Sequence, residues 1–280
     1  MNRFIKALLL FAFIVAVGAL LQSIRQAHAP KRIGVVYLKG MIDASSASDL
    51  LALLKRAFSR PDVAGVVLRI NSPGGSVAPS QEIYSYIMEH RKEKRIYASI
   101  GTVGASGAYY VASACNRVYA DGGSIVGSIG VIFTTSEIRG LLDKIGVRPV
   151  VIKSGKFKDV GSPFREMSPE ERSYIKSLLD EIHRQFVRDV AAGRGLKVEK
   201  VMKLADGRIF TGEQAVKLGL VDGVAPMWKV VESLSRDLGY SRPLETVVIE
   251  KKKGILDMLR AQAVAFVRDL KTELGQEDIR

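Results

Sequence analysis

Residues 63–76 read VAGVVLRINSPGGS, an apolar run that leads directly into a turn with two consecutive glycines. A short apolar run bounded by Pro and Gly predicts a strand that is buried on both faces, as strands are in parallel sheets covered by helices. Similar apolar runs predict strands at 33–38, 95–100, 118–120, 131–133 and 147–152. Helical spacing predicts helices at 49–58, 81–89, 106–114, 136–145, 198–204, 212–218 and 227–238. Strands separated by helices predict an α/β fold with a mostly parallel sheet.

Two helices carry start signals in the sequence. A long amphipathic helix is expected from Ser168 to Ala192, with Ser168 as N-cap, Pro169 in the first turn and Glu171 closing a capping box. For the helix at 49–58, either Ser46 or Ser48 is a candidate cap.

The composition restricts the class of protein. The chain has 280 residues, 47% of them hydrophobic, a formal net charge of +13 and one cysteine, which is enough apolar material for a large core. The basic residues are mixed with acidic ones, and the sequence has neither zinc-ligand spacing nor an RNA-binding aromatic signature, so we expect no nucleic-acid partner. Attraction to an anionic membrane surface explains the excess charge more simply.

The N-terminal segment predicts membrane attachment. Residues 4–24 are mostly apolar and contain only Lys6 as a charge, which is long enough to span a bilayer. A cleaved signal peptide ending at Ala27-His28-Ala29 is the alternative, although Arg25 and Pro30 fit cleavage poorly. We expect a retained single-pass anchor in the inner membrane. Because such a segment acts as an export signal, the domain that follows is expected on the extracytoplasmic side.

These features divide the chain into three parts. Residues 1–30 form the anchor and linker, residues 31–250 the catalytic domain, and residues 251–280 a C-terminal amphipathic helix. The apolar side of that helix, within 254–274, can pack on its own domain or on a neighbouring subunit, or it can lie on a membrane surface.

A serine lies at the start of one predicted helix in a run of small residues. Ser106 belongs to GASGAYY, residues 104–110, where small neighbours allow a tight turn with the hydroxyl exposed and the N–H of Gly107 free. A serine nucleophile needs an adjacent base. The three histidines, His28, His90 and His183, lie in the linker or in charged segments, so a lysine is the expected base.

Lys158, in SGKFKD at 154–159, is the candidate base. An ordinary lysine is protonated at neutral pH, but burial in an apolar pocket disfavours the charged form and allows an amine to accept a proton. The same segment contains Lys156, so spacing alone does not choose between them. A Ser-x-x-Lys pattern at Ser173 and Lys176 lies inside a charged amphipathic helix and is rejected as a second site.

Two glycine-rich turns complete the candidate site. The paired glycines at 74–75 let the backbone approach a ligand and direct N–H groups at it, as an oxyanion hole requires. The loop at 122–130 offers Ser128 to orient a neutral lysine amine. Each feature taken alone also fits an ordinary turn.

Taken together and in this order, these motifs resemble the signal peptide peptidase A family, membrane-anchored Ser–Lys peptidases of the Clp/crotonase-type fold. The resemblance extends from about Ile33 to Gly223. The matching motifs are NSPGG at 71–75, ASGAYY at 105–110, GSIGV at 127–131, SGKFKD at 154–159, SPFREM at 162–167, ADGR at 205–208 and GLVD at 219–222.

The resemblance implies a repeated β-β-α spiral core and a role for each matching residue. Ser106 would be the nucleophile, Lys158 the general base and Ser128 the residue that positions the lysine, while the N–H groups of Gly75 and Gly107 would form the oxyanion hole. The resemblance also implies ring-shaped homo-oligomers in which neighbours can complete the active site, and no metal or organic cofactor. The length of the chain resembles that of the single-domain members.

We therefore expect a membrane-anchored serine endopeptidase that degrades remnant signal peptides and other membrane-associated peptides. One alternative is a crotonase-type acyl-CoA enzyme, which would share the glycine-rich turn but would need a carboxylate at the site and an adenine-nucleotide pocket. The other alternative is a non-catalytic membrane scaffold that keeps the fold.

Overall fold

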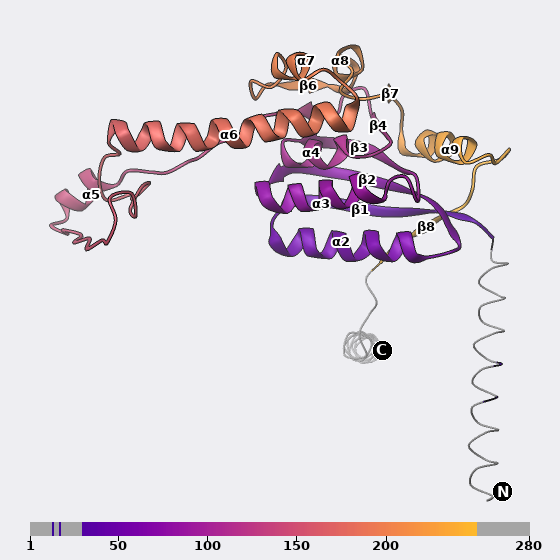
Figure 1. Cartoon of the computed structure of the whole chain (residues 1–280), viewed down its shortest axis with the longest axis horizontal. Helices are drawn as coiled ribbons and strands as arrows, with labels where there is room; N and C mark the ends of the chain where they lie inside the picture. Colours follow the sequence, from indigo (N-terminus) through magenta and orange to yellow (C-terminus); the bar gives the residue numbers. More distant parts are fainter. Residues whose placement is uncertain (1–12, 14–16, 18–29, 251–280) are drawn as a thin grey trace, which may run out of the picture.

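The computed structural model describes residues 30–250, together with Phe13 and Val17. Strands and helices alternate through the first half of this region, as the sequence predicts (Figure 1). The strands are β1 (Arg32–Ile42), β2 (Val63–Gly75), β3 (Ile96–Ala105), β4 (Arg117–Ala120), β5 (Ile125–Gly127), β6 (Ile209–Thr211), β7 (Gly223–Val224) and β8 (Thr246–Val248). The helices are α2 (Ala44–Ser59), α3 (Val77–His90), α4 (Gly107–Ser113), α5 (Arg139–Lys144), α6 (Pro169–Arg194), α7 (Val198–Met202), α8 (Gly212–Leu218) and α9 (Met227–Asp237).

The strands form one mostly parallel sheet. Its main path runs β6-β5-β3-β2-β1-β8, with only the β5–β6 pair antiparallel. Strand β3 has two neighbours on one side, because its first half pairs with β4 and its last residues, Val103–Ala105, pair with β5. The predicted α/β class and mostly parallel sheet are therefore confirmed. The carboxyl ends of β2, β3 and β5 meet at one edge, which is where parallel sheets bind ligands.

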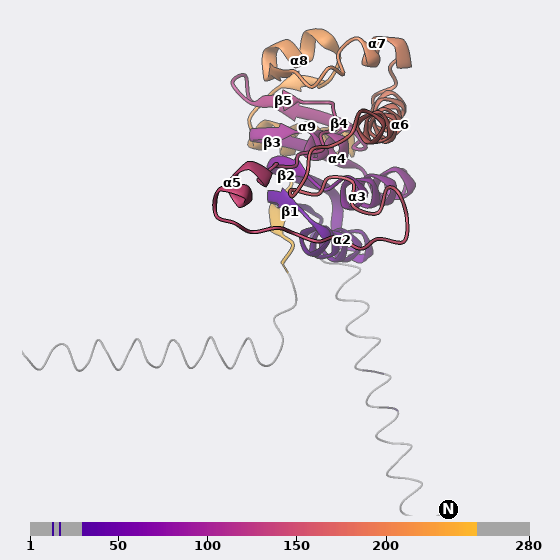
Figure 2. The same ribbon diagram turned by 90° about the vertical axis from the view of Figure 1, so that its left-hand side faces the viewer.

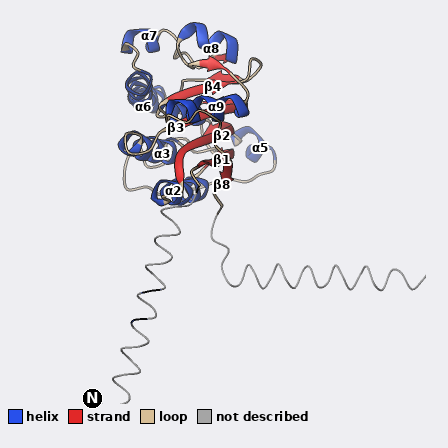
Figure 3. Ribbon diagram, turned by 90° about the vertical axis from the view of Figure 1, so that its right-hand side faces the viewer, coloured by secondary structure: helices blue, strands red, loops and turns tan. Residues whose placement is uncertain are grey.

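Helices cover both faces of the sheet (Figure 3). On one face α2, α3, α4 and the second half of α6 bury the main core, to which β2 contributes Val66, Leu68 and Ile70. On the other face α9 packs against Val67 and Tyr97, in a second, smaller cluster. Because successive strand side chains point to opposite faces, the near-continuous apolar run of β2 supplies both clusters.

Capping side chains fix where two of the helices begin. The predicted start of α6 is confirmed, since Ser168 and Glu171 form the capping box and Pro169 occupies the first turn. The predicted cap of α2 is wrong. Asp43, not Ser46 or Ser48, is the N-cap, and Ser46 is its capping-box partner three residues later, so the helix begins about one turn earlier than its apolar pattern indicates.

Between β5 and α6 the chain leaves the sheet and reaches the far end of α6, where α5 lies (Figures 1 and 2). We call residues 131–167 the extension. The strands predicted at 131–133 and 147–152 are wrong, because these segments belong to no strand. Their apolar side chains are largely uncovered within the described chain, and Ile152 is 96% exposed. β-Branched residues favour a strand only where a partner strand exists.

The predicted membrane anchor at 4–24 and the C-terminal helix at 254–274 lie outside the described residues, apart from Phe13 and Val17. Within the part of the chain that the structure describes, no helix combines the length and the apolar character needed to cross a bilayer.

Candidate active site

Ser106 occupies a strained position at the carboxyl end of β3. Its φ of 52° and ψ of −125° are unusual for any residue with a side chain. Its N–H donates to the carbonyl of Gly127 at 2.8 Å, and its own carbonyl accepts from the N–H of Tyr110 at 2.9 Å. The hydroxyl does not cap α4, although the residue stands at the N-cap. A backbone conformation of this kind costs about 1–3 kcal/mol and is typical of functional sites.

The two glycines that end β2 lie directly against Ser106. A side chain on Gly74 would place its Cβ 2.6 Å from the nitrogen of Gly107 and 2.9 Å from the Cβ of Ser106. A Cβ on Gly75 would lie 2.1 Å from the carbonyl oxygen of Ile42. Only glycine fits at either position, and both have positive φ. The close approach of neighbouring backbone segments therefore explains why two consecutive glycines occur here.

The backbone N–H groups of Gly75 and Gly107 belong to the same corner of the site. A Cβ on Gly107 would lie 3.3 Å from the nitrogen of Gly75 and 2.4 Å from Oγ of Ser80, which is buried. Gly107 is the first residue of α4, so no residue of this helix can accept its N–H. The arrangement is compatible with a pair of donors beside Ser106.

Ser128 occupies the position on β5 that matches Ser106 on β3. In the ladder Ala105 pairs with Gly127, and each serine is the next residue. Among the described residues, these two serines are the only non-glycine residues with positive φ, both at 52°. The N–H of Ser128 donates to the carbonyl of Arg208 at 2.9 Å. Two serines with positive φ therefore stand side by side at the sheet edge.

Ser106 and Ser128 line a hollow of about 410 Å³ between the sheet edge and α6, which we call the serine hollow. A much smaller apolar pocket of about 20 Å³ also borders Ser106, with Val77, Tyr110, Val131, Ile182 and Phe186 in its wall. The pocket is suited to a small apolar side chain. The serine hollow has the following further lining residues: Gly130, Val131, Ile132, Lys176, Leu179, Asp180, His183, Ala205, Asp206 and Gly207.

Lys158 lines neither of these two cavities within one chain. It is exposed on a loop of the extension, with its N–H donating to the carbonyl of Gly155 at 3.1 Å. The loop contacts the first turn of α6 through an ion pair between Lys156 and Glu170, 2.5 Å long. The small pocket touches α6 at Ile182, twelve residues further on, which corresponds to about 18 Å along the helix. The loop of Lys158 thus contacts the first turn of α6, whereas Ser106 lies beside the middle of this helix.

Sequence reasoning missed the contribution of α6 to the serine hollow. His183 was expected on a charged helix surface, but it lines the hollow, and its Nε2 is buried without a hydrogen-bond partner. Lys176, set aside with the Ser-x-x-Lys pattern, lines the hollow too and is paired with Asp180 at 2.7 Å. The spacing of 176, 180 and 183 places all three residues on one helix face. This spacing was the feature of the sequence that could have predicted their shared position.

Among the described residues, no group of three or more His, Cys, Asp or Glu side chains is placed to hold a metal ion. The site instead consists of a strained serine at a sheet edge, backbone N–H groups beside it and an adjoining apolar pocket. A mostly parallel α/β sheet with this site at its carboxyl edge is consistent with the class of proteins that have a Clp-protease-like fold.

Comparisons with known families agree with that class. The family model of Clp proteases matches residues 22–120, and the model of peptidase family S49 matches residues 88–240. The chain belongs to peptidase family S49.

Relatives of the chain carry the names of proteases. A protein of Synechocystis sp. named as a protease is 45% identical over 69% of this chain and 69% of its own length. One from Methanocaldococcus jannaschii, also named as a protease, is 38% identical over 70% of this chain and 63% of its own length. A protein of Enterococcus faecium named as a signal peptide peptidase is 33% identical over 82% of this chain and 70% of its own length.

Proposed function

We propose that this peptidase is a membrane-anchored serine endopeptidase with Ser106 as its nucleophile. The observation that carries the proposal is the strained backbone of Ser106, held against two glycines at the carboxyl edge of the sheet. Its hydroxyl does not cap α4, and Ser106 lines the serine hollow, whose volume of about 410 Å³ can accept part of a peptide. Strain of this kind is retained where it serves a function.

We further propose that Lys158 is the general base and reaches Ser106 from a neighbouring copy of the chain. Two observations support this. Lys158 is placed away from both cavities beside Ser106 in its own chain. The extension that carries it exposes many apolar side chains, including Val150 at 85% and Ile152 at 96%. Apolar surface on this scale is typical of interfaces, and a second copy in a ring would cover it.

The reaction follows from these roles. Oγ of Ser106 attacks the peptide carbonyl while its proton passes to Nζ of Lys158, which requires that the amine be uncharged. The N–H groups of Gly75 and Gly107 stabilise the oxyanion, and the hydroxyl of Ser128 orients the amine. Lys158 then donates the proton to the leaving amine. Water attacks the acyl-enzyme with Lys158 again as base and releases Ser106.

The proposed substrates are remnant signal peptides and other membrane-associated peptides, and the proposed site of action is the extracytoplasmic side of the inner membrane. A relative named as a signal peptide peptidase supports this substrate class. The small apolar pocket beside Ser106 is compatible with the small side chains that are common at signal-peptide cleavage sites. No cofactor is invoked in the mechanism.

A set of single variants tests the nucleophile and the base. Ser106→Ala and Lys158→Ala should each abolish cleavage of an apolar fluorogenic peptide while leaving the size of the oligomer unchanged. His183→Gln should retain kcat within about threefold, because general acid–base groups contribute about 10²–10⁴-fold and the proposal assigns that role elsewhere. If His183→Gln abolished turnover and Lys158→Ala did not, the base would be His183.

Two measurements on the wild-type chain separate the alternatives. A crotonase-type enzyme would bind coenzyme A, which calorimetry on the wild-type chain would detect. A non-catalytic scaffold would cleave no peptide in any preparation.

A further inference from the structure

The loop that carries Lys158 belongs to no helix or strand, yet several contacts fix it. Backbone turns join Lys158 to Gly155, and Val160 to Phe157 at 3.2 Å. The ring of Phe157 packs on that of Tyr174 in α6, with centroids 5.1 Å apart. A lysine that must meet a serine on another chain needs a more rigid support than two backbone turns and one ring contact.

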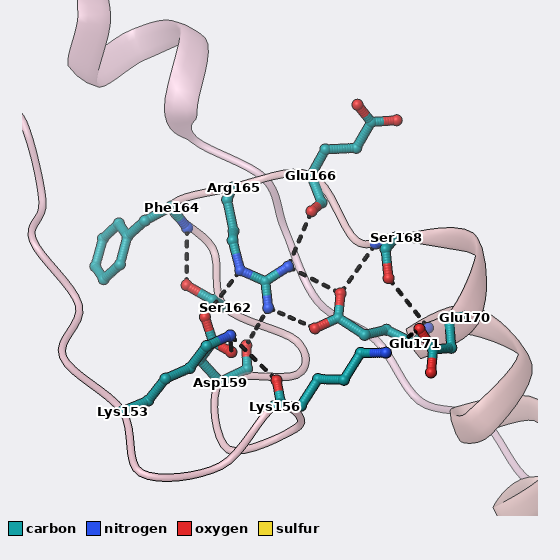
Figure 4. Close-up of polar contacts among 10 residues, drawn as sticks. All are labelled: Lys153, Lys156, Asp159, Ser162, Phe164, Arg165, Glu166, Ser168, Glu170 and Glu171. Atoms are coloured by element: carbon teal, nitrogen blue, oxygen red, sulfur yellow. Dashed lines mark hydrogen bonds and ion pairs between the residues drawn. The ribbon is translucent and has the colours of Figure 1, made fainter.

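A cluster of four charged side chains supplies that support (Figure 4). Asp159, the residue after Lys158, accepts from Nζ of Lys153 at 2.5 Å and from Nε of Arg165 at 2.8 Å. Arg165 donates from its two terminal nitrogens to the carboxylate of Glu171, at 2.8 and 2.5 Å. Lys153 also donates to the carbonyl of Lys156 at 3.1 Å. The cluster therefore holds the loop at Lys156 and at Asp159, on either side of Lys158 in the sequence.

The two carboxylates of the cluster are largely shielded from solvent, while Arg165 and Lys153 are about one third exposed. The side chains of Glu171 and Asp159 are 7% and 12% exposed, whereas those of the Lys156–Glu170 pair are 67% and 58% exposed. Hydrogen bonds from Arg165 lower the pKa of Glu171 to about 2 and also lower the pKa of Asp159. Bidentate Arg–carboxylate pairs fix geometry as well as charge, whereas exposed pairs contribute little.

Glu171 connects the cluster to the body of the protein. Its carboxylate also accepts from the N–H of Ser168 at 2.9 Å, as part of the box that caps α6. The other end of α6 lies against the helix that follows Ser106, where a Cβ on Gly193 would lie 2.3 Å from the carbonyl oxygen of Ser113. Helix α6 thus connects the Lys158 loop, at its first turn, to the region of Ser106, which lies beside the middle of the helix at Ile182 and Phe186.

We propose that Arg165 is a positioning residue for the Lys158 that its own chain supplies to a neighbour. By joining Asp159 to Glu171, it sets the place of Lys158 relative to α6, and hence relative to the serine hollow of the next copy. This inference rests on the proposed function, in which Lys158 completes the site of another chain. The carboxylates recognise Arg165 by its fork geometry, which lysine does not reproduce.

Mixed oligomers of the full-length protein test this role. An acceptor chain carries Lys158→Ala and keeps Ser106, a donor chain carries Ser106→Ala and keeps Lys158, and two affinity tags select oligomers that contain both. Misplacing a reacting group by about 1 Å can cost about 10²-fold in rate. Arg165→Met in the donor chain should therefore lower peptide cleavage on that order, whereas Arg165→Met in the acceptor chain should leave it unchanged.

The controls distinguish positioning from folding. Glu170→Gln in the donor chain removes a neighbouring carboxylate that belongs to an exposed pair, and should leave cleavage unchanged. If Arg165→Met reduced activity equally in donor and acceptor, or if the mixed oligomers no longer formed, Arg165 would support folding or assembly, and the proposal would be overturned.

The proposed function can fail separately. If mixed oligomers of donor and acceptor chains that both keep Arg165 cleave no peptide, a site shared between two chains is refuted. In that event Arg165→Met in an otherwise wild-type chain decides the positioning role. A fall in kcat with KM retained would support it, and an unchanged kcat would overturn it.

Discussion

At the scale of single residues, the backbone at Ser106 explains more than its side chain does. A serine at positive φ is held there by neighbours that permit no other arrangement: Gly74 and Gly75 on β2, and the Gly127 carbonyl on β5. The site is a junction of three strand ends. Its geometry is therefore sensitive to substitutions that add a single carbon atom.

Substitution of Gly75 by alanine is the sharpest test of this junction. The added Cβ would lie 2.1 Å from the carbonyl oxygen of Ile42, so β1 and β2 must separate and the N–H of residue 75 must move. Loss of one oxyanion donor costs about 10²–10³-fold in kcat, and we expect Gly75→Ala to lower kcat by at least this factor. Steady-state kinetics would measure it.

Gly123→Ala is the matched control, because a Cβ there meets no atom within 4 Å. It should leave kcat unchanged. If Gly75→Ala and Gly123→Ala had the same kcat, the proposed role of Gly75 in the oxyanion hole would be refuted.

The sequence revealed the serines and glycines of the site but not the α6 residues beside them. Small residues in a strand-to-helix turn indicate that backbones approach closely there, so Ser106 and the glycine pair stood out. His183 and Lys176 looked like parts of a charged helix surface, and the sequence does not show that this surface faces a cavity. Tertiary packing decided their role.

At the scale of elements, α6 and the extension are the distinctive parts of the molecule. The capping box of α6 was predictable, because Ser168, Pro169 and Glu171 are local signals. The strands predicted at 131–133 and 147–152 were wrong. An apolar β-branched run indicates that a segment becomes buried, but it does not show whether a neighbouring strand or another surface buries it. That surface does not come from the described residues of the same chain.

The acid stability of the extension follows from the Arg165 cluster. Hydrogen bonds from Arg165 lower the pKa of Glu171 from an ordinary 4.5 to about 2. A lowered pKa means that the stabilisation is complete above the ordinary value and is lost as the pH falls through the lowered one. We therefore expect residues 153–165 to stay protected from hydrogen exchange at pH 4 and to lose protection towards about pH 2.

The control for this prediction is Arg165→Met, in which no guanidinium holds the two carboxylates. Protection of the loop should then be reduced already at neutral pH. A wild-type loop that opened near pH 4.5 would contradict the role of the cluster.

At the scale of the whole molecule, the proposed mechanism requires assembly of several copies of the chain. One chain holds the serine hollow beside the middle of α6 and the Lys158 loop at its first turn, and in the proposed mechanism the two meet only between copies. The fold class, the sheet and the family were predictable from the sequence, because patterns and motifs lie along one chain. The separation of Ser106 and Lys158 was not predictable, because the distance between two motifs depends on how the connecting segment folds.

The exposed apolar residues of the extension should hold copies together. Ile152 is 96% exposed, and Ile152→Asp places a charge where an interface would exclude water. We expect this variant to form smaller species in size-exclusion chromatography with light scattering, and to lose peptide cleavage in parallel, with an unchanged circular dichroism spectrum.

Val198→Asp changes another exposed apolar residue, at the start of α7, and is the control for Ile152→Asp. It should alter neither size nor cleavage. An active monomer of the Ile152→Asp variant would show that a single chain completes its own site.

The most direct measurement is a structure of the full-length protein in its assembled form, by electron cryomicroscopy in detergent or nanodiscs. The account predicts that Nζ of Lys158 from one copy lies within about 2.6–3.2 Å of Oγ of Ser106 in the next, or one water molecule away. If every pairing of copies kept these two atoms far apart, the Ser106–Lys158 dyad would be refuted.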